Sequence, residues 1–417
     1  MLNSTSITFQ MKREILSFSN KISKKLSKPD KKFTADMTYG ILASKSCLLT
    51  DIVDHLHEKT KKINAVERLT KHLDKDVPKP ALKSYLSLVR SMTPSEPVIF
   101  IDDSDVTKPD GRHFEALGIV RDGSKSSDAK TVYEKGYHVT EACVLNKSGH
   151  PVSIFSKVHS SKEKNFTSVN DITFRAIETA CSLFGKATFV MDRGYDDNKM
   201  FLKLDSMEQD YIIRLTAKRK LLFHNKWIPA TRLRNQRKGK IKASFFYNGK
   251  NHAAYLSHVK VQITASKKDI CLVLVYGLSE HPMMLATNKV IRSKEDVIKV
   301  ARLYFSRWKI EEYFRSKKQL FQFENFRVRK LAAINALNFY ITLCMAFLAR
   351  LSMKPETSAL IVAIIKTAHP VKEKVRFRYY RLAKGVLGIL SYAKAGIRPW
   401  FRTKRPAYRQ LCLKLVV

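Results

Sequence analysis

The apolar positions of this chain follow two different periods, and the change between them marks its predicted organisation. Up to about residue 92 they recur at steps of three or four, which predicts helices, including one over 34–55 and one over 64–73. Beyond Pro97 the apolar runs are short and bounded by turn residues, which predicts strands. These strands cover 98–101, 114–120, 138–145 and 151–158, and the last three are predicted to form an antiparallel meander.

Two of the predicted strands are expected to be buried, the one at 98–101 because it is wholly apolar, as in a sheet that is covered on both faces, and acidic residues follow each of them. The strand at 98–101 precedes Asp102-Asp103-Ser104-Asp105. The strand at 187–191, which follows a predicted helix over 168–183, precedes Asp192. Carboxylates at the tip of a buried strand indicate a functional site. A polar turn gives the same pattern, because Asp and Ser are common turn residues.

The segment 293–320 has a long helical pattern. Ser293 and Asp296 form a capping signature, and no Gly or Pro follows before Leu320, which predicts a single helix. Its apolar stripe reaches Glu311 at the next step, so this carboxylate is expected to face the interior. The stripe consists of Val297, Ala301, Tyr304 and Trp308, and Arg307 and Lys318 lie on the same face.

A buried carboxylate at position 311 needs a cationic partner, a metal ion or a raised pKa. An ordinary internal ion pair between Arg307 and Glu311 would meet that need as well as a functional site would. If the acids at 102–105, Asp192 and Glu311 converge, however, their mutual repulsion requires a cation. Because all the ligands are oxygen, the sequence favours Mg²⁺ or Mn²⁺ over zinc.

Charge narrows the class of partner. The 417 residues include 77 Lys or Arg against 37 Asp or Glu, a formal net charge of +40, which favours a polyphosphate partner and therefore nucleic acid. The six cysteines are scattered without metal-binding spacing, which indicates a reducing compartment. No signal peptide is expected. The uncharged run 332–349 is predicted to be a buried core helix rather than a membrane span.

A basic stretch lies between Asp192 and Glu311. Residues 211–250 contain twelve Lys or Arg, no Asp or Glu, and interleaved aromatic rings, and 260–277 alternates as strands do. This predicts a mostly β insertion that presents cations to a nucleic-acid backbone, although a merely soluble basic loop region has the same composition. The cations expected to contact DNA are Arg234, Arg237, Lys238 and Lys240.

The predicted domain organisation has four parts. A basic helical domain over 1–92 is expected either to contact DNA or to cap the main domain. A catalytic α/β domain over 93–350 is interrupted by the β-rich insertion at 215–284. A basic helical region over 351–417 is expected to serve DNA contact or dimerisation, and the sequence does not separate the two roles.

The motifs resemble those of a known family. Tyr304, Arg307, Glu311 and Lys318 have the spacing Y-x2-R-x3-E-x6-K, which is similar to the signature of the bacterial insertion-sequence transposases of the cut-and-paste DDE type. Asp102 in Asp102-Asp103-Ser104 resembles the first acidic motif of that family. The run from Val190 to Tyr195 resembles the second, and the likeness extends from about 98 to 350.

The resemblance implies an RNase H-like core, a mixed sheet flanked by helices. It implies that Asp102, Asp192 and Glu311 are catalytic and metal-binding, with Asp103 as the alternative to Asp102. Two Mg²⁺ ions are expected, with Mn²⁺ possible. Tyr304, Arg307 and Lys318 are expected to hold DNA.

The implied activity is cleavage at the ends of an element followed by strand transfer into target DNA. The expected partners are double-stranded DNA and, on DNA, a second copy of the chain, with no membrane. The expected location is the cytoplasm and the nucleoid. An RNase H-like nuclease without strand transfer and a non-catalytic DNA-binding relative are the alternatives.

Overall fold

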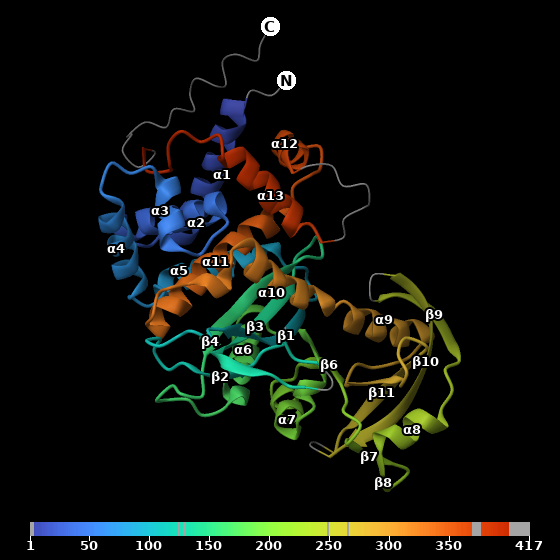
Figure 1. Ribbon diagram of the computed structural model, residues 1–417. Helices are drawn as coiled ribbons and strands as arrows, with labels where there is room; N and C mark the ends of the chain where they lie inside the picture. The colour runs from blue at the N-terminus through green and yellow to red at the C-terminus, as the bar shows by residue number, and fades with distance from the viewer. Residues whose placement is uncertain are drawn as a thin grey trace. The chain divides into compact units, whose positions relative to one another are not determined.

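The computed structural model describes residues 4–123, 125–127, 130–247, 250–264, 267–368 and 377–399 (Figure 1). The basic run at 372–376 and the tail at 400–417 lie outside the described residues. The chain divides into two compact units. The first unit comprises Met1–Ser91, Val106–Tyr137 and Arg315–Val417, and the second comprises Met92–Asp105 and His138–Phe314.

A mixed β-sheet forms the centre of the second unit. Its neighbouring strands are, in order, β3 (Tyr133–Leu145), β1 (Val98–Thr107), β5 (Thr188–Met191), β6 (Asp210–Arg214), β12 (Met283–Thr287), β11 (Asp269–Tyr276), β10 (Lys250–Ile263), β7 (Lys220–Phe223) and β8 (Lys226–Pro229). β4 (Pro151–His159) pairs with β3, and β9 (Ile241–Tyr247) pairs with β10. β5 is parallel to both β1 and β6, whereas the pairs from β6 to β8 are antiparallel.

β1 is the central strand that its apolar run predicts. Ile99, Phe100 and Ile101 are fully buried, as expected for a strand with protein on both faces. The prediction that the strand ends at Asp102 was wrong, because β1 continues to Thr107. The acidic residues therefore belong to the second half of the strand, where alternate side chains still point to opposite faces.

The other predicted elements around β1 are present, although the strand predicted at 114–120 begins only at Gly118. β3 pairs antiparallel with β4 and, through its first residues in the first unit, with β2 (Gly118–Arg121), which forms the predicted meander. The predicted helix at 168–183 is α6 (Val169–Phe184), and the Ser168 hydroxyl caps it by accepting from the backbone N–H of Asp171. α6 packs against β4 and α7 (Asn198–Ser206).

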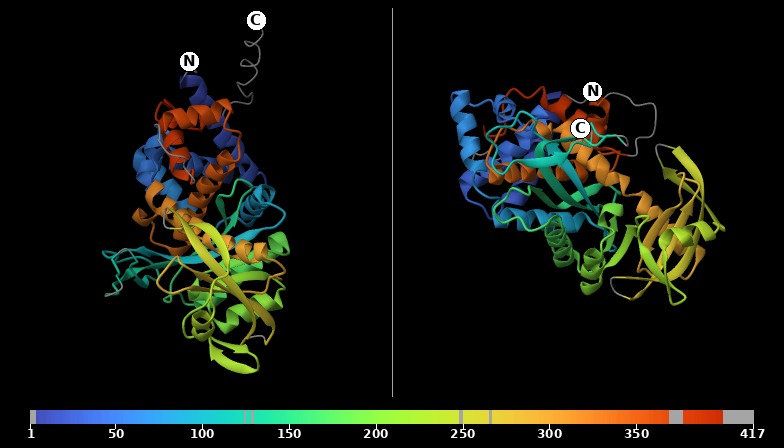
Figure 2. Two further views of the ribbon diagram at one scale, coloured as in Figure 1. Left: turned by 90° about the vertical axis from the view of Figure 1, so that its right-hand side faces the viewer. Right: turned by 60° about the horizontal axis from the view of Figure 1, so that its bottom comes forward.

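The chain between β6 and β12 forms the predicted β-rich insertion. Its strands β7 to β11 carry one short helix, α8 (Ala230–Gln236). α9 (Lys294–Phe305) packs against β9, β10 and β11 (Figure 2). Phe305 of this helix lies with its ring centroid 5.0 Å from that of Phe245 on β9. The predicted α/β class with a mostly β insertion is thus confirmed.

The prediction of one helix over 293–320 was wrong. Ser293 and Asp296 form the expected capping box, but α9 ends at Phe305 and α10 (Trp308–Leu320) follows. Between them the backbone N–H of Arg307 bonds to the oxygen of Tyr304 at 3.0 Å, three residues back instead of four. The chain tightens into a turn there without Gly or Pro, so no residue type at this point signals the break.

The first unit is built around α11 (Leu331–Ser352), which is apolar on all sides and therefore buried. By length and composition α11 could cross a membrane, and among the described residues it alone meets that test, but 89% of its apolar window is buried in protein. The prediction of a core helix at 332–349 fits this burial. The other elements are α1 (Ser4–Ser23), α2 (Lys28–Ser44), α3 (Leu49–Leu56), α4 (Lys62–Leu73), α5 (Lys79–Met92), η2 (Phe323–Asn325), α12 (Ala359–Thr367) and α13 (Tyr379–Leu390).

Helices from the two ends of the chain pack against each other in this unit. α11 contacts α2, α4 and α13, and α13 also contacts α1 and α2. The single helix predicted over 34–55 was wrong, because Lys45 adopts a left-handed conformation that separates α2 from α3. The sequence predicts domain boundaries at residues 92 and 350, that is, parts of the chain that fold independently. These boundaries stay a prediction.

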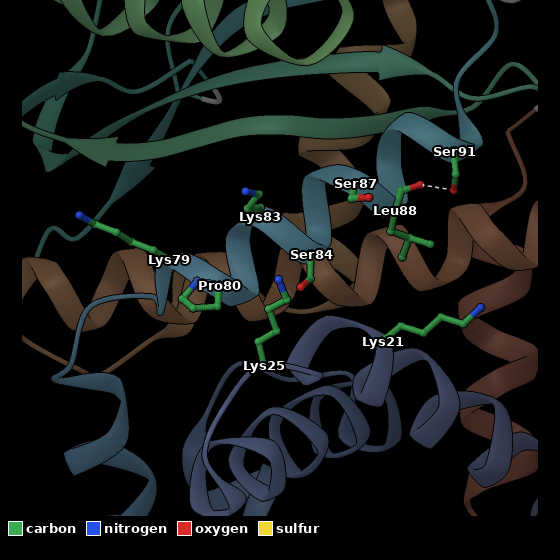
Figure 3. A pocket seen from close by; sticks show the side chains of 9 residues that line it. All are labelled: Lys21, Lys25, Lys79, Pro80, Lys83, Ser84, Ser87, Leu88 and Ser91. Atoms are coloured by element: carbon green, nitrogen blue, oxygen red, sulfur yellow. Dashed lines mark hydrogen bonds between the residues drawn. The ribbon is translucent and has the colours of Figure 1, made fainter.

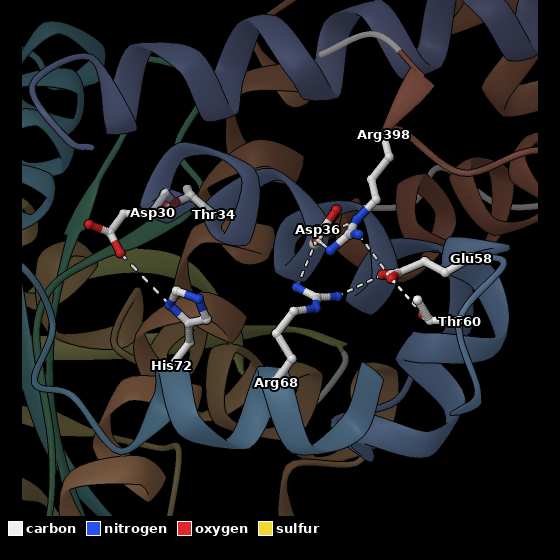
Figure 4. A network of polar contacts seen from close by, with 8 residues as sticks. All are labelled: Asp30, Thr34, Asp36, Glu58, Thr60, Arg68, His72 and Arg398. Atoms are coloured by element: carbon white, nitrogen blue, oxygen red, sulfur yellow. Dashed lines mark hydrogen bonds and ion pairs between the residues drawn. The ribbon is translucent and has the colours of Figure 1, made fainter. Parts of the chain in front are cut away.

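A buried network of charges joins these helices (Figure 4). Asp36 on α2 has no exposed surface, and it accepts from Arg398 at 2.9 Å and lies 3.5 Å from Arg68. Glu58 accepts from the same two arginines at 2.6 and 2.9 Å. Burial raises the pKa of Asp36, against the lowering effect of Arg398 and Arg68. The network fixes Arg398, near the end of the described chain, to the N-terminal helices.

Close packing of α12 on α13 gives the first prediction. A Cβ added at Gly385 of α13 would overlap the backbone oxygen of Ile364 on α12. Alanine favours a helix over glycine by about 1 kcal/mol, yet we expect Gly385→Ala to lower the free energy of unfolding by about 1–3 kcal/mol, because the two helices must move apart. Denaturant unfolding of the full chain measures this change.

Gly388→Ala on the same helix is the matched control. Its Cβ would lie 2.5 Å from Cγ2 of Thr367, a side-chain atom that can rotate away, so its decrease in stability should be smaller. Equal or higher stability of the Gly385→Ala protein would contradict the close packing of α12 on α13.

Candidate active site

The pairing of β1 with β5 brings two distant acids to one level of the sheet. Ile101 is the register partner of Met191 in this parallel pair. Asp102 and Asp192 are the next residues of the two chain segments, so they follow the pair side by side. The parallel register, rather than any local motif, produces this convergence.

The end of α9, the turn after it and the start of α10 place three side chains at these acids. The Tyr304 hydroxyl donates to Oδ1 of Asp192 at 3.2 Å. The guanidinium of Arg307 donates to Oδ2 of Asp102 at 2.8 Å and to Oε1 of Glu311 at 2.6 Å. The structure therefore gathers Asp102, Asp192 and Glu311 around the charge of one arginine.

The exposure of these side chains corrects one expectation. Glu311 was predicted to face the interior, but its side chain is 51% exposed, whereas that of Arg307 is 15% exposed. The break before α10 takes Glu311 off the buried stripe of α9. The glutamate thus meets the arginine at the rim of the site, with one side open to solvent.

Burial, and after it the neighbouring charges, set the electrostatics of the site. The protein around Asp102 keeps water away and raises its pKa to about 7, helped by Asp103 and Asp192 and opposed by Arg307. Burial lowers the pKa of Arg307, but Asp102 and Glu311 outweigh it and hold that pKa above its usual value. Burial and the nearby Asp192 carboxylate raise the pKa of Tyr304 to about 12, so its hydroxyl keeps its proton.

Asp103 has different neighbours from Asp102. The Thr140 hydroxyl of β3 donates to its Oδ1, and the hydroxyl of Tyr195, in the short helix η1 (Arg193–Tyr195), donates to Oδ2 at 3.0 Å. Thr140 also lies 2.9 Å from Nε2 of the fully buried His159. Both oxygens of Asp103 are thus held by neutral hydroxyls of the scaffold, whereas Asp102 pairs with a charged guanidinium.

No three His, Cys, Asp or Glu side chains in the described part of the chain are arranged to hold a metal ion as they stand. At this site the Arg307 guanidinium lies between Asp102 and Glu311, in the place that a metal ion would need. The donor set nevertheless suits a divalent ion. It consists of carboxylate oxygens already gathered around a positive charge, and Glu311 is open to solvent.

Comparison with known protein families identifies the domain that carries this site. The model of the transposase DDE domain family matches residues 93–347. The chain belongs to this family. Its mixed sheet with flanking helices is the RNase H-like arrangement expected of such a domain. No curated protein matches the chain.

Membership in this family makes the protein a transposase, an enzyme that acts on DNA. Transposases of the DDE family generally depend on divalent metal ions, in agreement with the donor set of the site. The matched range contains Asp102, Asp192, Arg307 and Glu311, and it begins just before β1.

The remaining predicted site residues lie elsewhere. Lys318 belongs to the first unit, where its ammonium lies 3.0 Å from Glu324. Arg234, on α8, and Arg237 lie in the insertion, and Arg237 donates to the backbone oxygen of His258 at 3.1 Å. Lys238 and Lys240 are exposed there.

Sequence reasoning assigned no role to the groups that hold Asp103 or to the chain after Asp192. Tyr195 was part of a quoted motif, but Thr140 and His159 come from the meander, where cross-strand pairing alone brings His138 opposite His159. Asp196, whose side chain is fully buried, pairs with Arg219 at 2.6 Å. The acidic residues that follow Asp192 in the sequence were the one available signal for the pair of Asp196 with Arg219.

His159 gives a pH-dependent prediction. Burial and, to a smaller extent, the nearby His138, Lys157 and Arg175 together lower its pKa to about 4. The unfolded chain, with a histidine pKa of about 6.5, then binds a proton that the folded protein does not, so stability is full above that pH and falls as the pH drops toward 4. We expect this group to remove about 2.5 kcal/mol of unfolding free energy between pH 8 and pH 4.5.

Denaturant unfolding at several pH values measures this contribution. The His159→Gln protein should have a shallower decline of stability across the window than the parent. His224→Gln, which replaces an exposed histidine of the same unit, is the control and should leave the slope unchanged. Identical slopes for all three proteins would contradict a neutral, buried His159.

Proposed function

We propose that this transposase cleaves DNA at the ends of an insertion sequence and joins those ends to target DNA, with Asp102, Asp192 and Glu311 as its catalytic carboxylates. The observation that carries the proposal is the gathering of these three side chains around Arg307. Active sites commonly concentrate charged groups in this way.

The same three carboxylates are proposed as the metal ligands. Two divalent ions are expected, Mg²⁺ or alternatively Mn²⁺, and when bound they supply charge stabilisation at the attacked phosphate and lower the pKa of a bound water. For these carboxylates to bind metal ions, Arg307 must move away from Asp102 and Glu311. A released guanidinium can hold a DNA phosphate through two parallel hydrogen bonds, which is the proposed role of Arg307 during cleavage.

Other residues have supporting roles in this proposal. Tyr304 orients Asp192 through its hydroxyl and packs beside the scissile strand. Lys318 holds a phosphate as a point charge. Asp102 is preferred to Asp103 as the ligand because of the kind of donor that each accepts. Neutral scaffold hydroxyls hold both oxygens of Asp103. Asp102 accepts from the backbone N–H of Asp103 and from Arg307, a cation that a metal ion can replace.

The chemistry is two successive attacks on phosphorus. In the first, a water oxygen attacks a phosphodiester at the element end, the bond to the 3′-oxygen breaks, and that oxygen takes up a proton. In the second, the freed 3′-hydroxyl loses its proton and attacks a phosphodiester of the target, and the displaced 3′-oxygen leaves. Each step exchanges one phosphorus–oxygen bond for another, so no oxidant or energy donor is needed.

The remaining proposals concern partners and location. Double-stranded DNA is the substrate, the basic regions at 1–92 and 351–417 contribute contacts or dimerisation, and two copies act together on DNA. Because this activity takes place on DNA, the proposed location of the protein is the cytoplasm and the nucleoid, with no contact to a membrane.

The catalytic carboxylates are tested by isosteric substitution. We expect Asp102→Asn, Asp192→Asn and Glu311→Gln each to reduce Mg²⁺-dependent cleavage by at least about a hundredfold, because each removes a charged ligand worth several kcal/mol in the transition state. DNA affinity in EDTA should stay within a few fold. The assay uses a duplex carrying the DNA that flanks the open reading frame.

Asp103→Asn is the matched control and should be milder, because one hydroxyl can still donate to the amide oxygen and the other can turn to accept from the amide nitrogen. If it alone abolishes cleavage, Asp103 is the ligand and Asp102 is not. Cleavage without joining of pre-cleaved ends would indicate a nuclease, and no metal-dependent cleavage by the parent protein would indicate a non-catalytic DNA-binding relative.

The proposed DNA contacts of the insertion are tested by the salt dependence of DNA affinity. Replacement of Arg234, Arg237, Lys238 and Lys240 by alanine should weaken duplex binding and reduce the slope of log affinity against log salt by about 0.9 for each phosphate that is no longer neutralised. The exposed Lys238 and Lys240 should account for more of the effect than Arg237, which is already bonded to His258. An unchanged slope would show that these cations face only solvent.

A further inference from the structure

A pocket lined by lysines lies in the first unit, and none of its residues belongs to the candidate active site (Figure 3). Its volume is about 680 Å³. The walls come from the end of α1, the turn that follows it, and one face of α5. The lining residues are Lys21, Lys25, Lys79, Pro80, Lys83, Ser84, Ser87, Leu88 and Ser91, and together they form what we call the lysine pocket.

The sequence of α5 explains why a pocket exists there. Ser84, Ser87 and Ser91 recur at steps of three and four, so they share one face of the helix. Their short side chains leave space beside α1 that leucine or phenylalanine would fill. The opposite face of α5 is apolar, and it buries Tyr85 and Val89 in the core of the unit.

The charge of the lysine pocket has one sign only. Lys21, Lys25, Lys79 and Lys83 are all exposed, and no acidic residue lines the pocket. None of these four lysines takes part in the ion pairs of the described part of the chain, whereas Lys62 and Lys71, on α4 of the same unit, pair with carboxylates. Four uncompensated ammonium groups around one hollow attract an anion that carries several charges.

Among anions with several charges, the remaining lining residues favour a nucleic-acid backbone. Serine hydroxyls and lysines are common partners of phosphate oxygens. The pocket has no Arg, Asn or Gln, the side chains that read base edges through paired hydrogen bonds. It also has no aromatic ring on which an unpaired base could stack.

We propose that the lysine pocket holds one sugar–phosphate strand of duplex DNA without reading its sequence. The proposal rests on the proposed function and adds to it a surface for contact with any DNA, distinct from the recognition of element ends. Such a contact raises the affinity for every duplex by the same factor. It therefore leaves discrimination between sequences to other parts of the chain.

The test replaces Lys21, Lys25, Lys79 and Lys83 by glutamine in the full-length protein, which removes the charges and keeps most of each aliphatic stem. Affinity is measured in EDTA, over a range of salt, on two duplexes of unrelated sequence, on a single strand and on anionic lipid vesicles. We expect affinity to fall at least about tenfold on both duplexes, and a salt slope smaller by up to about 3.6, or 0.9 for each of four neutralised phosphates.

The matched control replaces Lys59, Lys61, Lys75 and Lys384, four exposed lysines of the same unit, by glutamine. It changes the net charge by the same amount and should alter the slope by less than about 0.9. Both variants should melt at the temperature of the parent, because every replaced side chain is exposed. If the pocket variant melts lower, the pair Lys79→Gln and Lys83→Gln alone should still reduce the slope by up to about 1.8.

Several results would overturn the proposal. These are an unchanged slope, an equal effect of the control, weaker binding confined to one duplex sequence, or weaker binding to single strands or vesicles instead of duplex DNA. The proposed function fails separately, when the parent protein shows no metal-dependent cleavage. If the parent protein cleaves DNA and the pocket variant binds DNA as tightly as the parent, the proposed role of the lysine pocket is wrong and the catalytic assignment stands.

Discussion

The repulsion among closely placed carboxylates is the constraint on which this site depends. Asp102 and Asp192 come side by side because β1 and β5 are parallel neighbours, and Glu311 approaches from α10. Without a cation the group would resist folding, and Arg307 supplies that charge from within the chain. The free protein can therefore keep its sheet and its helical turn in place before any ion or DNA arrives, although one side chain must move afterwards.

Much of this arrangement could be predicted from sequence because it is encoded locally. The apolar runs before Asp102 and Asp192 specified β1 and β5, and the spacing of Tyr304, Arg307 and Glu311 placed them near one another. What could not be predicted depends on contacts between distant segments. The extension of β1 beyond Asp102 is supported by its neighbours in the sheet, and the break before α10 has no Gly or Pro to announce it.

The cations in the described part of the chain divide into those that already have acidic partners and those that do not. Arg68, Arg219 and Arg398 neutralise buried carboxylates and belong to the scaffold. The lysines of the lysine pocket and Lys238 and Lys240 are exposed. A net charge of +40 is therefore a poor measure of DNA affinity by itself, and the distinction needs the structure rather than the composition.

The central place of α11 has a consequence for how the chain folds during synthesis. α2 ends at Ser44 and α11 begins at Leu331, so at about 5–20 residues per second the N-terminal helices wait roughly 15 to 60 s for the helix that covers them. Arg398, which completes the network around Asp36, is made later still. Through that interval α2 and α4 have the neighbouring N-terminal helices to pack on, but they lack the surface that α11 covers. The nascent first unit is thus open to aggregation and to chaperones until α11 has left the ribosome.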